Sequence, residues 1–238
     1  KKNILLICAN GNHKKWTEDE LRHFVGDQVF NEFWSCGQLV NHDCTREEEL
    51  IYLGKTGSGC VVEHNKNFLE SDLMIYVGQV MVNSWGGYTG TGAVVGLAST
   101  RSILSHHNHK IVSDPETTLG DHKRMHFRKL KAEINKTIES ETKKRIFYIN
   151  YVGGTGGNIS RIFAGYSPEM DEASWEAADN FSIVDVPQAD IFVIGLTESY
   201  AYGSANNPLI ATIGMAYPTR VWLGDHLLKE GGVVIGLT

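Results

Sequence analysis

Short, continuous apolar runs recur along this chain, and each is followed by a polar or glycine-rich turn. Four of them, at residues 3–9, 73–78, 145–152 and 191–196, have the composition of strands buried on both faces of a parallel sheet. Segments with helical spacing lie between them. This alternation of strand, turn and helix predicts an α/β protein.

Capping residues and apolar spacing locate the helices. Thr17 and Glu20 form a capping box that opens a helix to about Gly26. We expect its apolar face to hold Leu21, Phe24 and Val25. Further helices are predicted from Ser99 toward His107, over 122–138, over 171–180 and after 206–208. The helix over 122–138 has Phe127, Leu130, Ile134 and Ile138 on one face. Its basic residues are interpreted as a solvated face: Lys123, Arg124, Arg128, Lys129 and Lys131.

Charge and hydropathy narrow the choice of partners and location. The formal net charge of -6 argues against a nucleic-acid partner, which would require a basic surface. No apolar run approaches the ~20 residues that span a bilayer. No signal peptide precedes the first strand, so a cytoplasmic location is expected. Both ends look cut, and we expect the chain to be part of a longer gene product.

Two glycine-rich segments, residues 85–92 and 153–157, lead to different predictions. Residues 85–92 hold four glycines after a buried strand, where backbone amides can approach a ligand. A plain loop explains this composition equally well. The run Gly153–Gly157 also follows a strand, but it does not have the spacing of a dinucleotide-binding loop. A turn is the better interpretation of that second segment.

Ten histidines are available for chemistry. His13 lies in the turn after the first strand, where a ligand-facing side chain belongs in an α/β sheet. His106, His107 and His109 lie together, and a neutral imidazole among them suits nickel, zinc or iron. Exposed side chains at the end of a helix are the alternative, and spacing alone favours that alternative.

Together these segments resemble the lactate racemase family, the nickel-pincer-dependent racemases and epimerases of 2-hydroxyacids. The resemblance extends over nearly the whole chain, in the order and spacing of several short motifs. They are residues 4–13 with 17–21, 40–43, 52–54, 71–78, 87–90, 96–99 with 103–107, and 189–191. The resemblance implies two Rossmann-like α/β domains with a cleft between them, at residues 1–184 and 185–238, the second incomplete.

The resemblance also implies residue roles around a nickel-pincer nucleotide, a pyridinium-3,5-bisthiocarboxylic acid mononucleotide that holds nickel. His13 falls on the first acid/base histidine, and His107 falls on the nickel ligand. The second acid/base histidine falls on Asn83, and the lysine that anchors the cofactor covalently falls on Ala93. The candidate cofactor-binding positions are Gly87, Thr89, Gly90 and Ala93.

Because Asn83 and Ala93 stand where the family has a histidine and a lysine, two hypotheses remain. The first is an isomerase that racemises or epimerises a 2-hydroxyacid or sugar acid, with the cofactor held noncovalently. Its motivation is that His13 and His107 keep their matched places. The second is a noncatalytic hydroxyacid- or sugar-acid-binding homologue, because neither asparagine nor alanine supplies the missing chemistry.

Overall fold

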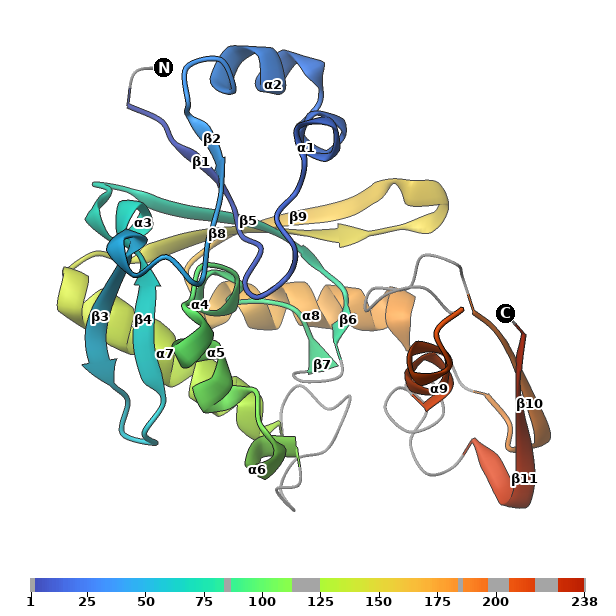
Figure 1. Cartoon of the computed structure of the whole chain (residues 1–238). Helices are drawn as coiled ribbons and strands as arrows, with labels where there is room; N and C mark the ends of the chain where they lie inside the picture. Colours follow the sequence, from blue (N-terminus) through green and yellow to red (C-terminus); the bar gives the residue numbers. More distant parts are fainter. Residues whose placement is uncertain are drawn as a thin grey trace.

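The protein is described by a computed structural model over residues 3–83, 87–112, 125–183, 186–196, 206–216 and 227–237. Helices and small sheets alternate along the chain, so the predicted α/β class is confirmed (Figure 1). Three strand pairs are parallel: β1 with β2, β5 with β8, and β10 with β11. The predicted domain boundary at residues 184 and 185 lies outside the described residues.

The first part of the chain folds as a parallel strand pair with two helices. Strand β1 (Leu6–Cys8) pairs with β2 (Leu39–Asn41), and α1 (Glu18–Val25) and α2 (Asp27–Phe33) connect them. The capping box is confirmed, since Thr17 Oγ1 accepts from Glu20 N and Glu20 Oε2 accepts from Thr17 N. Leu21 is fully buried, but Phe24 is 64% exposed and is not part of the core as predicted.

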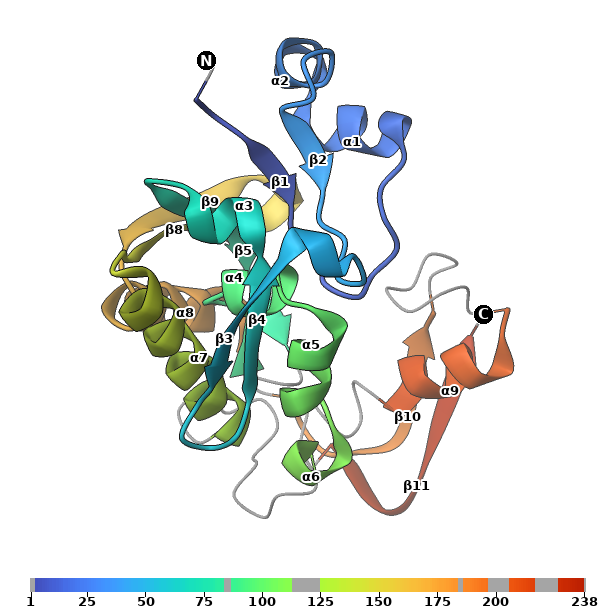
Figure 2. The same ribbon diagram turned by 60° about the vertical axis from the view of Figure 1, so that its left-hand side comes forward.

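A three-stranded sheet lies at the centre of the molecule. Strand β8 (Ile146–Gly153) pairs in parallel with β5 (Met74–Val80) and antiparallel with β9 (Ile159–Gly165). Helix α8 (Glu169–Ser182) packs against all three strands, and Figures 1 and 2 show α7 (His126–Thr142) beside it. The predicted burial of β5 on both faces is wrong, because Ile75 and Val77 point away from these helices and are exposed.

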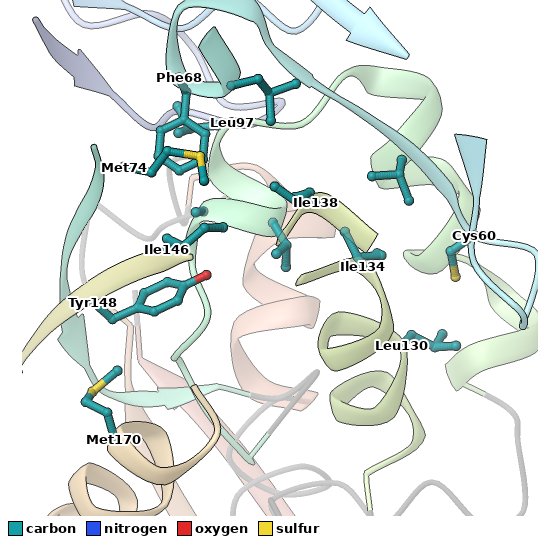
Figure 3. Packing of buried hydrophobic residues seen from close by; sticks show 14 residues of the cluster. Cys60, Phe68, Met74, Leu97, Leu130, Ile134, Ile138, Ile146, Tyr148 and Met170 are labelled. Carbon is teal, nitrogen blue, oxygen red and sulfur yellow. The ribbon is translucent and has the colours of Figure 1, made fainter. Parts of the chain in front are cut away.

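The largest core cluster joins this sheet to α7 (Figure 3). Met74, Ile146 and Tyr148 contribute from the sheet. The predicted apolar face of α7 is confirmed, since its four residues are all buried: Phe127, Leu130, Ile134 and Ile138. The helix begins at His126 rather than at 122, because Met125 has extended backbone angles and acts as the N-cap residue.

The basic residues of α7 do not form one solvated face. Lys129 is exposed, as expected, whereas Arg128 and Lys131 are buried at 9% and 5% exposure. The interpretation of these two side chains as solvated is therefore wrong. Lys123 and Arg124 lie outside the described residues.

The remaining elements complete the fold around this core. Strands β3 (Leu50–Lys55) and β4 (Val61–Asn65) form a hairpin after the 3-10 turn η1 (Glu47–Glu49), and α3 (Lys66–Glu70) leads into β5. The antiparallel strands β6 (Val82–Asn83) and β7 (Gly87–Tyr88) precede α4 (Ala93–Gly96), α5 (Thr100–His106) and α6 (His109–Val112). The turn η2 (Thr155–Gly157) joins β8 to β9.

The end of the chain forms a separate parallel pair. Strand β10 (Ala189–Gly195) pairs with β11 (Leu228–Leu237), and α9 (Pro208–Ala216) lies between them in sequence. Figure 2 shows this pair well apart from the central sheet. Among the described residues, no helix combines the length and apolarity required to cross a membrane.

Candidate functional site

The glycine-rich loop after β5 is held tightly by the protein itself. Asn83 of β6 pairs with Gly87 of β7. Thr89 N donates to Met81 O at 2.9 Å, and Trp175 Nε1 of α8 donates to Thr89 O at 2.9 Å. The loop is therefore fixed to strand β5 on one side and to helix α8 on the other.

A buried carboxylate holds Thr91, two residues further along this loop. Asp171 is 1% exposed. Its carboxylate accepts from Thr91 Oγ1 at 2.7 Å, Ser167 Oγ at 2.8 Å, and Asn150 Nδ2 and Thr91 N at 3.3 Å each. Four donors thus saturate a charge that would be costly to bury without partners.

Two buried cations meet the loop at Gly90. Lys131 Nζ and Arg128 Nη1 both donate to the Gly90 carbonyl oxygen, and the Arg128 guanidinium lies over the Trp175 ring at 4.3 Å. Burial lowers the pKa of Arg128 to about 10, although Asp171 opposes this shift. Burial and the Arg128 charge lower the pKa of Lys131 well below its ordinary value. The sequence interpretation missed both cations.

His106 and His107 pack against each other at the end of α5. Their Nδ1 atoms are 2.8 Å apart, so one ring donates to the other, and both rings pack against Phe127. Burial lowers the pKa of His107 to about 4, with smaller effects from the charges of Lys131 and His13. His106 is fully buried rather than exposed at a helix end, so that interpretation is wrong for it.

His13 and His107 lie within electrostatic range of each other. His13 is exposed in the turn after β1, where its backbone N–H donates to Asn10 O at 2.9 Å. Its charge acts on His107, and the charge of Lys131 acts on both His106 and His107. Lys131 also contacts Gly90. Lys131 therefore lies within electrostatic range of His106 and His107 and in contact with the glycine-rich loop.

Two other candidate positions, Ala93 and Asn83, lie in different environments. Ala93 has no exposed surface and lies in the main core cluster with Leu130 and Ile134. Asn83 is half-buried in β6, where it pairs with Gly87 of β7. Asn83 and Gly87 thus lie side by side in the glycine-rich segment.

Two further histidines have structural positions. His42 Nε2 bonds the Ala98 carbonyl at 2.9 Å, and His64 Nε2 bonds the Val94 carbonyl at 3.1 Å. Both rings are buried. Within the described part of the chain, no group of three or more His, Cys, Asp or Glu side chains forms a metal site.

Residues 1–120 match the sequence profile described as "Lactate racemase N-terminal domain". The chain belongs to the lactate racemase family. It is similar to the lactate racemase of Thermoanaerobacterium thermosaccharolyticum, with 26% identity over 242 residues, covering 98% of this chain and 51% of that protein. The resemblance inferred from the short motifs is confirmed.

Two solved structures share this lactate racemase family fold. The lactate racemase apoprotein from T. thermosaccharolyticum matches with a TM-score of 0.77 and 25% identity, covering 98% of this chain and 52% of that one. A protein from Thermotoga maritima matches with a TM-score of 0.67 and 16% identity, covering 96% and 57%. The chain spans about half the length of these relatives.

Proposed function

We propose that this chain carries the reaction centre of a racemase or epimerase that acts on a 2-hydroxyacid or sugar acid. The cofactor would be a nickel-pincer nucleotide, bound without a covalent link at position 93. The proposal is carried by the match of residues 1–120 to the lactate racemase N-terminal domain, in which His13 and His107 keep the matched places of two functional histidines and lie within electrostatic range of each other. The two residues come from elements far apart in the sequence.

The two imidazoles would have different tasks. His13 is exposed and would accept a proton from the substrate hydroxyl and return it, because an imidazole can act as both base and acid. His107 is held uncharged by burial, which keeps a nitrogen lone pair available for a metal. Its Nδ1 contacts His106 Nδ1. When bound, the cofactor supplies the hydride chemistry at C2.

His107 fits this cofactor as a nickel ligand, whereas Ala93 does not fit its covalent attachment. A single neutral imidazole is what a metal already held by a pincer requires, and His107 provides it. The covalent link does not fit position 93, where the Ala93 methyl group is packed in the core. The Gly87, Thr89 and Gly90 segment is proposed as the cofactor-facing loop because Gly90 and His107 share Lys131 as a neighbour.

We also propose the larger organisation that the family implies. The site would lie in a cleft between two Rossmann-like domains, at residues 1–184 and 185–238. A small-molecule acid would be the partner, and neither nucleic acid nor membrane would be bound. A cytoplasmic location agrees with this chemistry.

Metal analysis combined with a stereochemical assay tests the proposal. The protein is coexpressed with the enzymes that make the cofactor, and nickel content and visible absorption are measured on the purified chain. A panel of enantiopure 2-hydroxyacids and sugar acids is then followed by chiral chromatography. We expect nickel near one per chain and inversion at C2 for at least one acid. A metal-free, colourless preparation that inverts no acid would contradict the proposal.

Matched variants assign the roles of the histidines. His107→Gln should abolish nickel retention, whereas His109→Gln, an exposed neighbour, should not. His13→Gln should retain nickel but lose inversion, and His23→Gln on the exposed side of α1 serves as its control. Loss of nickel in His13→Gln would contradict the assignment of His13 as the proton-exchange group.

Asn83 and Ala93 favour a second candidate function, a noncatalytic binding homologue. It predicts that a 2-hydroxyacid or sugar acid binds in calorimetry while no acid in the panel is inverted. The variant Asn83→His separates the two candidates further. An isomerase that lacks one acid/base group should become faster, whereas a binding protein without the cofactor should remain inactive.

A further inference from the structure

The three-stranded sheet has one covered face and one exposed face. Helices α7 and α8 pack on one side of it (Figure 1). The side chains that alternate with the buried ones along each strand point to the other side, which we call the outer face. Its main apolar side chains come from all three strands and from the residue directly after β9: Ile75, Val77, Phe147, Ile149, Ile162 and Tyr166.

The strand register arranges these side chains in adjacent rows. Ile75 of β5 is paired with Phe147 of β8, and Val77 is paired with Ile149 in the next row but one along the strands. The Phe147 ring meets the Tyr166 ring edge-on, with the two ring centroids 5.5 Å apart. Because the rows are contiguous, the outer face is one apolar patch rather than a set of scattered side chains.

Much of the outer face is in contact with solvent in the single chain. Val77 and Ile162 are each 63% exposed, Ile75 is 47% exposed and Tyr166 is 40% exposed. With its half-buried members, the face presents roughly 600 Å² of side-chain surface, since large apolar side chains offer on the order of 150–250 Å² each when fully exposed. Single exposed apolar side chains are ordinary, but a contiguous patch of this size is typical of an interaction site.

The architecture of the sheet makes this exposure more unusual. Strands β5 and β8 are parallel, and parallel strands are almost always covered on both faces. Within the described strands, the paired positions on the outer face hold no charged side chain. Permanent homodimers have more apolar interfaces than transient complexes, so a patch without charges favours a partner that stays bound.

We propose that the outer face is the interface of a homodimer, in which the outer faces of two copies of this chain pack on each other. Twisted sheets pack face to face with their strands crossing at about 30°, so an identical sheet offers a matching shape. A two-fold axis then places the same patch on both sides of the interface. The exposed area approaches the ~800 Å² that each partner contributes to an interface of standard size.

Light scattering coupled to size-exclusion chromatography tests the homodimer on the whole chain. We expect the wild-type protein to have twice the chain mass of 26.4 kDa. Val77→Lys places an exposed charge on the single chain but buries two unpaired charges in the dimer, so it should raise the dissociation constant at least about hundredfold. Leu104→Lys, at a position 59% exposed on α5, is the matched control and should leave the mass unchanged.

Carbene footprinting of the wild-type chain decides the question even where Val77→Lys does not fold. Val77 and Leu104 are similarly exposed in the single chain, so a monomer would label both peptides to a similar extent after normalisation to the unfolded chain. The homodimer should label the Val77 peptide several-fold less than the Leu104 peptide. A single chain mass, equal labelling of the two peptides, or a dimer that Val77→Lys leaves intact would each overturn the proposal. None of these outcomes depends on the proposed racemase activity.

Discussion

The glycine-rich segments at residues 87–96 and 153–157 have similar compositions and different surroundings. The first is buried against α7 and α8, and its carbonyl groups accept hydrogen bonds from Trp175, Lys131 and Arg128. The second is an exposed turn between β8 and β9, closed by a 2.8 Å bond from Gly154 N to Asn158 O. Glycine content alone therefore does not distinguish a functional loop from a turn, whereas the polar groups packed around the glycines do.

If the buried polar cluster fixes the first segment, removing its carboxylate should have the largest effect. In Asp171→Asn, an amide group would face donors of Thr91, Ser167 and Asn150, and the nearby cations would lose their closest negative charge. We expect the free energy of unfolding to fall by about 4 kcal/mol, as for a broken buried charge network. Urea denaturation measures this change.

The neighbouring residue provides the control for that substitution. Glu172→Gln changes an exposed carboxylate in the same helix and should alter stability by less than about 0.5 kcal/mol. Equal effects of the two substitutions would mean that the cluster does not hold the segment, and the contrast between the two glycine-rich regions would disappear.

The glycines themselves give a sharper comparison, since both have a positive φ. Gly90 has φ +149°, and an added Cβ would lie 2.6 Å from Asp171 Oδ1 and 3.1 Å from Trp175 Nε1. Gly157 has φ +79°, and an added Cβ would meet nothing within 4 Å. Gly90→Ala should cost about 3 kcal/mol from crowding and strain, and Gly157→Ala about 1 kcal/mol from strain alone.

Thermal and urea unfolding of both glycine variants would decide this prediction. A larger cost at Gly157 would show that packing around Gly90 adjusts freely, against the tight positioning that Asp171 and Trp175 imply. The two variants share the same chemical change, so any difference between them reports on the surroundings and the backbone conformation of each glycine.

Local sequence signals predicted the elements but not their surroundings. The capping box at Thr17 and Glu20 placed α1 correctly, because it depends on residues three apart. Phe24 was assigned to the core of that helix and is exposed, since no other element covers it. The continuous apolar composition of β5 likewise could not show that helices cover only one face of its sheet.

The position of Lys131 was readable from the sequence and was overlooked. At about 100° per residue, Lys131 lies only about 40° from Phe127 around the helix axis, within the apolar stripe. Lys129 and Lys136 lie on the opposite side and are exposed. Arg128 lies at the edge of the stripe, and its burial depends on Trp175 from another helix. A count of basic residues concealed this difference, which a helical projection would have shown.

For His106 and His107, the sequence spacing predicted the wrong relative orientation of the two side chains. The adjacency of His106 and His107 predicts side chains about 100° apart on a helix. The helix ends at His106, however, and the backbone of His107 leaves the helical conformation, so the two Nδ1 atoms come within 2.8 Å. The proximity of His13 depends on tertiary structure and was expected only from the family resemblance.

A change of pH should affect the two glycine-rich regions differently, and this is the smallest of the expected effects. His64 Nε2 holds the Val94 carbonyl in the first segment, and burial lowers the pKa of His64 to about 4. An unfolded histidine binds its proton near pH 6.5. Between these values the unfolded chain binds more protons than the native one, so stability is complete above pH 6.5 and declines as the pH falls toward 4.

We expect His64 to account for roughly 2 kcal/mol of lost stability at pH 5, since each pKa unit corresponds to about 1.4 kcal/mol. Hydrogen exchange measured from pH 7 to pH 5 should show faster exchange of the amides of Val95, Gly96 and Leu97, after correction for the intrinsic rate, with little change at Gly154. His64→Gln should reduce the pH dependence by that amount, and His23→Gln, on the exposed surface, should not. Equal acceleration in the two segments would show that acid acts on the whole fold, and the buried loop would then have no local dependence on His64.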